Sequence, residues 1–170
     1  THFLTNGFTT GDDVVTNTNG EKYVSWNWKA NGAGSSNTTG SINTIATSAN
    51  VNAGFSIIKY TGNAISGATI GHGLSKAPEF WTVKRLNSAG DDWNSYHEGI
   101  SDVDPETDWI RLNAAQGSSD NAAMWNDQAP TSSVIYLGNH AEVNGSNDTY
   151  ICYAWHSVEG YSQMGMYTGN

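Results

Sequence analysis

The chain has 170 residues, which suits one domain of ordinary size. Hydrophobic residues make up 37% of it, but 7 Trp, 8 Tyr and 4 Phe can bury enough area to close a core. The formal net charge of -9 argues against a nucleic acid or an anionic membrane as partner, because both require a basic surface. The single cysteine, Cys152, excludes an internal disulfide and a multi-cysteine zinc site, and its strand context predicts a buried, inert thiol.

Alternating apolar and polar residues predict an all-β chain of short strands. In residues 22–29, for example, Val24, Trp26 and Trp28 fall on one face. Asn-Gly pairs at 6–7, 19–20, 31–32 and 144–145 predict tight turns, since both residue types tolerate positive φ. Residues 113–124 are the only segment that could form a helix, and the sequence predicts at most one short helical turn there. The predicted strands are 22–29, 55–60, 79–86, 108–112, 132–137 and 149–156.

An internal repeat links the two ends of the chain. Residues 8–28 (FTTGDDVVTNTNGEKYVSWNW) match residues 135–155 (IYLGNHAEVNGSNDTYICYAW) at one fixed offset. Residues 54–63, which end in YTGN, match residues 160–170 in the same order, so that 8–63 and 135–170 carry the same passage. The intervening segment 33–53 is low in complexity and predicts a surface loop or a weak edge strand. Either the chain is a fragment of a longer tandem array, or both passages lie side by side in one closed sandwich.

Several longer motifs carry a family resemblance. They are GFSIIKYTGN (54–63), TIGHGLSKAPEFWTVKR (69–85), WNDQAPTSSVIYLG (125–138) and DTYICYAWHSVEGYSQMGMYTGN (148–170). Together they resemble an uncharacterised repeat family of marine phage and prophage tail-associated proteins. The resemblance implies a single β-sandwich domain over 1–170, of jelly-roll or lectin-like type, at the virion surface and outside the cell. It also implies other virion subunits as partners and, because fibres commonly trimerise, a homotrimer.

An acidic stretch departs from that family pattern and offers a candidate cation site. Asp102, Asp104, Glu106 and Asp108 alternate, which gathers oxygen ligands of the kind that Ca²⁺ prefers. The stretch lacks EF-hand spacing, and acidic surface loops are usually only solvated, so no cofactor is required.

Aromatic residues around the same stretch form a candidate glycan site, comprising Trp93, Tyr96, His97 and Trp109. Aromatic rings stack on the apolar face of a pyranose, while neighbouring carboxylates accept its hydroxyl hydrogens. The alternative is that Trp93 and Trp109 fill the core, where large aromatics are mostly found. Trp26, Trp28 and Trp155 are assigned to the core or an interface, and Trp125 to a loop surface or a cap of the sandwich.

Catalytic signatures are weak. His97-Glu98 does not form an HExxH motif, and the chain has no GxSxG nucleophile elbow. We therefore predict a non-enzymatic structural and adhesive module of a phage virion that binds host glycans. Two alternatives stay open, a glycan hydrolase on the same sandwich and a purely architectural spacer.

Overall fold

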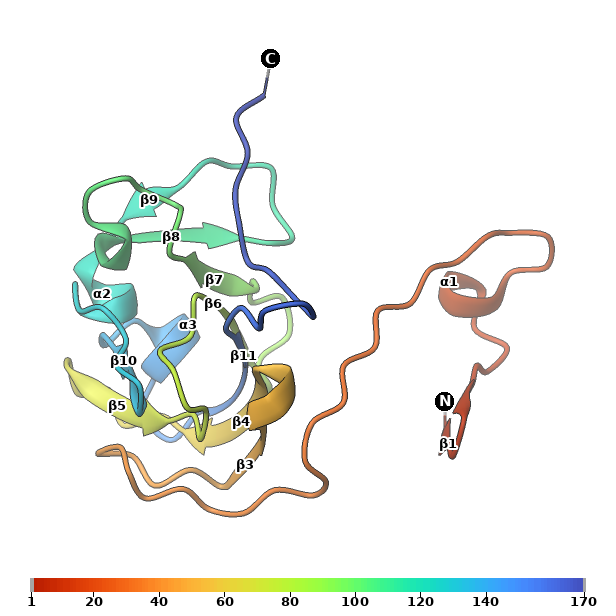
Figure 1. The fold of residues 1–170 in the computed structure, drawn as a ribbon, viewed down its shortest axis with the longest axis horizontal. Helices are drawn as coiled ribbons and strands as arrows, with labels where there is room; N and C mark the ends of the chain where they lie inside the picture. The colour runs from red at the N-terminus through yellow and green to blue at the C-terminus, as the bar shows by residue number, and fades with distance from the viewer. Residues whose placement is uncertain (1, 170) are drawn as a thin grey trace.

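Seven strands form the main antiparallel sheet in the computed structural model, which describes residues 2–169 (Figure 1). The central strand, β11, pairs with β4 on one side and with β6 on the other. Its last residue, Trp155, therefore lies beside Phe55 and Phe80. In spatial order the strands are β3 (Ala46–Asn50), β4 (Phe55–Thr61), β11 (Thr149–Trp155), β6 (Phe80–Arg85), β7 (Asn94–His97), β8 (Asp108–Arg111) and β9 (Ser119–Asp120).

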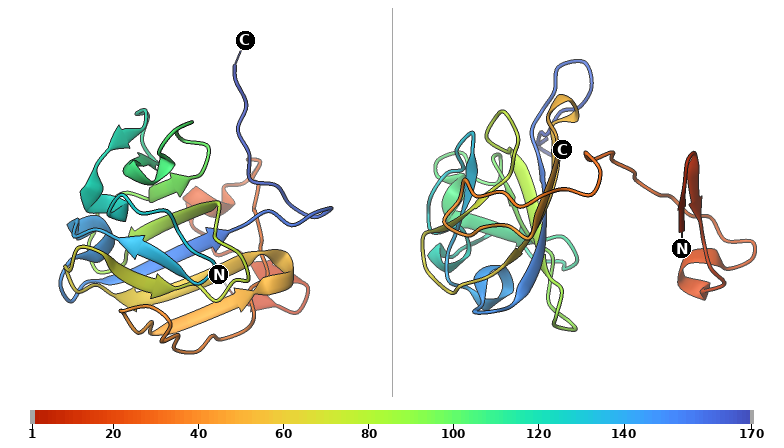
Figure 2. Two further views of the ribbon diagram at one scale, coloured as in Figure 1. Left: turned by 60° about the vertical axis from the view of Figure 1, so that its left-hand side comes forward. Right: turned by 90° about the horizontal axis from the view of Figure 1, so that it is seen from below.

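A second layer covers one face of this sheet and closes the core (Figure 2). It consists of the antiparallel pair β5 (Ala68–Gly71) and β10 (Val134–Leu137) with the short helices α2 (Ala122–Trp125) and α3 (Ala141–Asn144). The predicted all-β sandwich is thus confirmed, while the jelly-roll or lectin-like topology stays a prediction. The largest fully buried side chains include Trp81, Trp125, Tyr60, Tyr150 and Ile58.

Two stretches lie outside this body, which we define as residues 31–157. The N-terminal arm, residues 2–29, holds the hairpin β1 (His2–Leu4) and β2 (Gly7–Thr9) and the one-turn helix α1 (Val14–Asn17). It extends from the face of the sheet opposite the second layer (Figures 1 and 2). The C-terminal tail, residues 158–169, projects from the end of β11.

Most strand predictions are confirmed, and one is wrong. The alternating runs at 55–60, 79–86, 108–112, 132–137 and 149–156 become β4, β6, β8, β10 and β11, and segment 33–53 contains the edge strand β3. Residues 22–29 are not a strand, because no other part of residues 2–169 pairs with them. Of the two repeated passages, 8–63 and 135–170, β4 of the first pairs with β11 of the second, whereas residues 8–28 do not pair with residues 135–155. The tandem-array and closed-sandwich explanations of the repeat both stay predictions.

The burial of side chains confirms the prediction of a buried thiol at Cys152 and corrects the predicted position of Trp125. Cys152 is fully buried, and burial raises the pKa of its thiol. Trp125 is also fully buried, within α2, so it belongs to the core rather than to a loop surface. Within residues 2–169, none of the helices has the length and apolar character needed to cross a bilayer.

Candidate functional site

Aromatic rings gather on the face of the main sheet that points away from the core. Successive strand residues point to opposite faces, so burying Tyr150, Cys152 and Ala154 directs Tyr153 and Trp155 outward. Pairing of β11 with β4 and β6 places further outward rings beside these two. We call the set Phe55, Phe80, Trp93, Tyr153 and Trp155 the aromatic face.

The rings of the aromatic face form a continuous row. The rings of Phe55 and Tyr153 are nearly parallel, at 7° and 6.4 Å between centroids. Trp93 stacks beyond Tyr153 at 6.0 Å, and Phe80 stacks on Trp155 at 5.2 Å. Their positions are fixed by backbone pairing, so the row is rigid and already formed.

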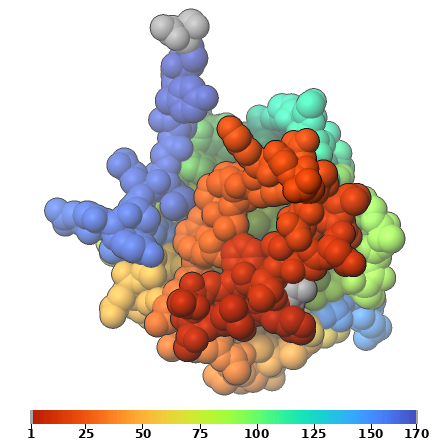
Figure 3. Space-filling view, turned by 90° about the vertical axis from the view of Figure 1, so that its right-hand side faces the viewer, coloured from red at the N-terminus to blue at the C-terminus, as the bar shows by residue number. Residues whose placement is uncertain are grey.

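The N-terminal arm crosses the aromatic face and encloses a groove. Trp28 of the arm packs edge-on against Trp155, with centroids 5.6 Å apart, and also contacts Phe55. Figure 3 shows the arm lying over this face, with an opening between its segments. Among the described residues, Lys29 is the only charged one lining the groove. The lining consists of Phe3, Leu4, Thr5, Asn6, Gly7, Phe8, Trp26, Asn27, Trp28, Lys29, Phe55, Ile57, Thr82, Trp93, Leu112, Tyr153 and Trp155.

The four residues predicted to bind glycan do not form one surface. Trp93 lies in the groove, but Tyr96 and Trp109 are only 3% and 6% exposed and belong to the core. Tyr96 stacks on Trp81 at 3.9 Å on the inner face of the sheet. His97 is on the outer side, beside Phe80 and away from the groove lining. Trp93 is therefore the one residue of the four that contributes to the groove.

The predicted cation site is not assembled. Within residues 2–169, no group of three or more His, Cys, Asp or Glu side chains is arranged to hold a metal, so Asp102, Asp104, Glu106 and Asp108 do not converge. Residues Pro105–Thr107 form a 3-10 turn that separates them. The side chain of Asp104 accepts a hydrogen bond from Ser101 Oγ at 3.3 Å. Partial burial, followed by the carboxylate of Asp120, raises the pKa of Asp108.

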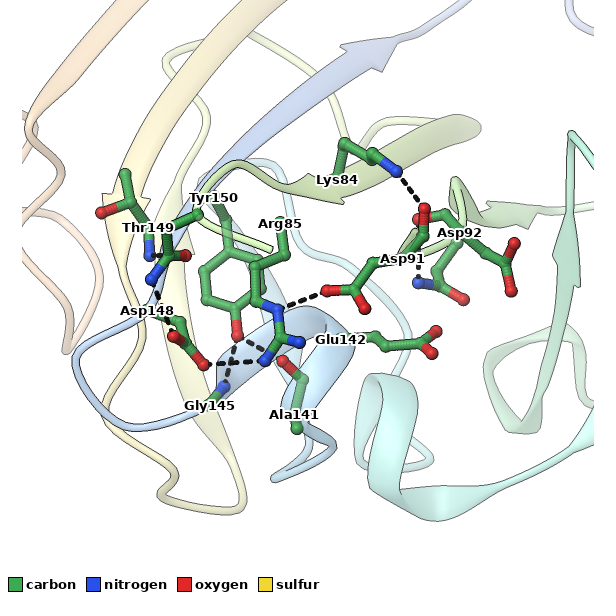
Figure 4. Close-up of polar contacts among 12 residues, drawn as sticks. Lys84, Arg85, Asp91, Asp92, Ala141, Glu142, Gly145, Asp148, Thr149 and Tyr150 are labelled. Atoms are coloured by element: carbon green, nitrogen blue, oxygen red, sulfur yellow. Dashed lines mark hydrogen bonds and ion pairs between the residues drawn. The ribbon is translucent and has the colours of Figure 1, made fainter. Parts of the chain in front are cut away.

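A charged network near the start of β11 is a structural brace (Figure 4). Arg85 lies between two carboxylates, contacting Asp91 through Nε and Asp148 through Nη1 at 3.0 Å. Asn87 donates to the same Asp148 at 2.9 Å, and this bond, followed by the Arg85 contact, holds the pKa of Asp148 below its usual value. One guanidinium is thus shared by two carboxylates, and the network ties β6 and its following loop to the residue before β11.

Glu79 and Glu98 are a candidate catalytic carboxylate pair. Both line a shallow depression beside the C-terminal tail. Burial, and then the charge of Glu79, raises the pKa of Glu98. However, Glu79 Oε2 accepts hydrogen bonds from both the backbone N–H, at 3.0 Å, and the hydroxyl of Ser157. Glu79 thus anchors the chain after β11 instead of being directed toward a substrate.

Comparison with known proteins gives one match. A protein-family profile described as "Domain of unknown function (DUF7483)" matches residues 1–170. No curated protein and no solved structure shows significant similarity to the chain.

Proposed function

The chain belongs to this family of domains of unknown function over its whole length, and we propose that it is a non-catalytic module that binds neutral glycans in the groove. The observation that carries the proposal is the rigid row of aromatic rings on the outer face of the main sheet, flanked by the tryptophans of the arm.

The chemistry of the groove suits a pyranose. Flat ring faces such as those of Trp93 and Tyr153 stack on the C–H face of a sugar, and polar side chains beside them bond its hydroxyl groups. Thr5, Asn6 and Asn27, all from the arm, supply such donors and acceptors. Amides and hydroxyls here take the role that the sequence had predicted for the carboxylates of the acidic stretch.

Charge favours a neutral ligand. Lys29 is the only charged liner of the groove within the described residues, whereas the chain as a whole carries a net charge of -9. A negatively charged polysaccharide would be repelled by the protein and would find one cation in the groove. Neutral pyranose oligomers avoid both costs.

This role accords with the adhesive virion module that the sequence resemblance implies. Attachment to host glycans, a place among other virion subunits and a homotrimeric state remain predictions of that resemblance. The rivals are a glycan hydrolase, which would use Glu79 and Glu98, and a spacer, in which the aromatic face would contact only a neighbouring unit.

A glycan-array screen tests the proposal. The array should contain neutral and acidic oligosaccharides, and the panel should include the native chain, Trp93→Ala, Trp26→Ala and the control Tyr161→Ala. Removing one stacking ring costs about 1.4 kcal/mol, or about tenfold in affinity. Tyr161 is the control for the groove because its exposed ring lies on the tail and lines the depression of Glu79 and Glu98 instead, so loss of binding in Tyr161→Ala alone would indicate that depression.

The expected result is binding to neutral oligosaccharides that weakens in both groove variants and persists in Tyr161→Ala. Release of reducing ends from a bound oligosaccharide, abolished by Glu79→Gln, would instead support the hydrolase. Absence of binding across the array would contradict the proposal and favour the spacer.

A further inference from the structure

The N-terminal arm repeats the local structure of β10, α3 and β11, 127 positions earlier, the separation of Gly11 from Gly138. In the arm the order is β2, α1 and then residues 22–28 in extended conformation. The resemblance extends beyond sequence, because the same side chains make the same hydrogen bonds in both copies.

An asparagine closes the loop before the helix in both copies. In the body, Asn144 Nδ2 donates to the carbonyl of Gly138 at 2.8 Å. In the arm, Asn17 Nδ2 donates to the carbonyl of Gly11 at 2.6 Å. The donor and acceptor atoms are of the same kind in both copies, and donor and acceptor residues are each separated from their counterparts by 127 positions.

A tyrosine hydroxyl closes the turn after the helix in both copies. In the body, the backbone N–H of Gly145 donates to the Tyr150 hydroxyl at 2.7 Å (Figure 4). In the arm, the backbone N–H of Thr18 donates to the Tyr23 hydroxyl at 2.8 Å. Each hydroxyl in turn donates to the first residue of its helix, Ala141 in the body and Val14 in the arm.

The two copies differ in what surrounds them. In the body, β11 is the central strand of the main sheet and Tyr150 is 0% exposed. In the arm, Tyr23 is 52% exposed and residues 22–28 have no ladder partner among residues 2–169. Unpaired backbone on both sides of an extended segment is a template for further strands.

The outward-facing residues of 22–28 fit the central position of such a sheet, whereas Ser25 and Asn27 stand at the inward positions of Cys152 and Ala154. Val24, Trp26 and Trp28 occupy the positions of Ile151, Tyr153 and Trp155 on the outer face. Trp26 is 73% exposed, whereas its counterpart Tyr153, flanked by the strands β4 and β6, is partly buried.

We infer that residues 7–28 are the last element of another unit of this fold, the unit that precedes this one in a longer polypeptide. In the body the element comes last, after the strands β4 and β6 that flank it. By the same order, the strands that flank the arm are placed ahead of it along the polypeptide. The strands that pair with residues 22–28 are therefore the β4-like and β6-like strands of a preceding unit, one on each side.

This inference is independent of the proposed glycan binding, yet it relates the groove to the tandem arrangement of units. With residues 22–28 inserted, Trp26 and Trp28 would lie on the outer face of the preceding sheet. The contact of Trp28 with Trp155 then makes the groove a gap between the outer faces of two consecutive units.

A chain with a partial preceding unit tests the inference. Residues 31–133, which lack β10, α3 and β11, are placed directly before residue 7 of the chain, so that the arm is the last element available to them. A second version changes four arm residues to their counterparts in the body, by Thr10→Leu, Thr16→Val, Ser25→Cys and Asn27→Ala. Hydrogen exchange of the arm amides is measured in both and in the native chain.

The expected result is rapid exchange of the amides of residues 16–18 and 22–28 in the native chain, and at least 100-fold slower exchange in either fused version. Adding Asn17→Ala and Tyr23→Phe to a fused version whose arm amides exchange slowly should restore their rapid exchange. Arm amides that exchange as fast in both fused versions as in the native chain would overturn the inference.

Discussion

Replacing Asn144 by alanine should destabilise the body far more than the same change at Asn17, its counterpart in the arm. Asn144 is fully buried. Its amide donates to Gly138 at 2.8 Å and to Ile65 at 3.0 Å, and its carbonyl accepts from the N–H of Asn63 at 2.9 Å.

The magnitude follows from these three bonds. A hydrogen bond contributes about 1 kcal/mol, and a buried group left without a partner costs about 1–3 kcal/mol. Gly138 is buried and loses a partner that water does not easily replace, whereas Ile65 is exposed. We therefore expect Asn144→Ala to cost about 3 kcal/mol. Asn17 is exposed, so water replaces its bond to Gly11 and Asn17→Ala should cost less than about 0.5 kcal/mol.

Urea unfolding followed by far-ultraviolet circular dichroism measures both changes. With a urea dependence of about 2 kcal/mol per M, Asn144→Ala should lower the unfolding midpoint by about 1.5 M, and Asn17→Ala should leave it unchanged. Equal shifts in the two variants, or a cost below about 1 kcal/mol for Asn144→Ala, would refute the assignment of the two copies as one buried and one exposed element.

Three further predictions concern single buried groups. Tyr60→Phe should cost about 1–2 kcal/mol in urea unfolding, because the buried hydroxyl donates to Val143 O at 2.6 Å, while the half-buried Tyr153→Phe should cost almost nothing; equal costs would count against this packing. Burial lowers the pKa of His72 from 6.5, so the unfolded chain binds the proton more readily than the folded chain. The stability that neutral His72 contributes should be complete above pH 6.5 and should decline as the pH falls through the folded pKa. In urea titrations at several pH values, the unfolding free energy of His72→Gln should lack this decline. If the variant keeps the full slope, His72 is not the group responsible. Cys152 should resist a thiol reagent in the native chain and react fully in urea, since its thiol is buried and its pKa is raised by burial; fast native labelling would show an open core.

The strands could be predicted from sequence wherever alternation coincided with a partner. β4, β6 and β11 have both strong alternation and neighbours to pair with. Residues 22–29 have the same alternation but no strand neighbour within the described residues 2–169. Alternation indicates which face of a strand is apolar, but it does not reveal whether the strand that would complete the ladder is present. The short β5 and β7 escaped prediction because each contains one large apolar residue, Ile70 and Tyr96, whereas the equally short β8 and β10 contain two or more.

The aromatic face could not be predicted from closeness in sequence. Trp93 and Tyr96 are three positions apart, and an odd separation in extended chain puts them on opposite faces of the sheet. Trp93 therefore faces the groove, whereas Tyr96 enters the core. The partners of Trp93 are Tyr153 and, beyond it, Phe55, which only the pairing of β4 with β11 brings together.

The indole N–H signals of the seven tryptophans offer the most direct test of glycan binding in the groove. Trp26, Trp28, Trp93 and Trp155 line the groove, whereas Trp81, Trp109 and Trp125 are buried in the core and serve as internal controls. Each signal is followed by NMR while neutral cello-, manno- and chito-oligosaccharides are added in turn. We predict that at least one oligosaccharide shifts the groove signals and leaves the three core signals in place. Unchanged groove signals with every oligosaccharide would contradict the proposed function.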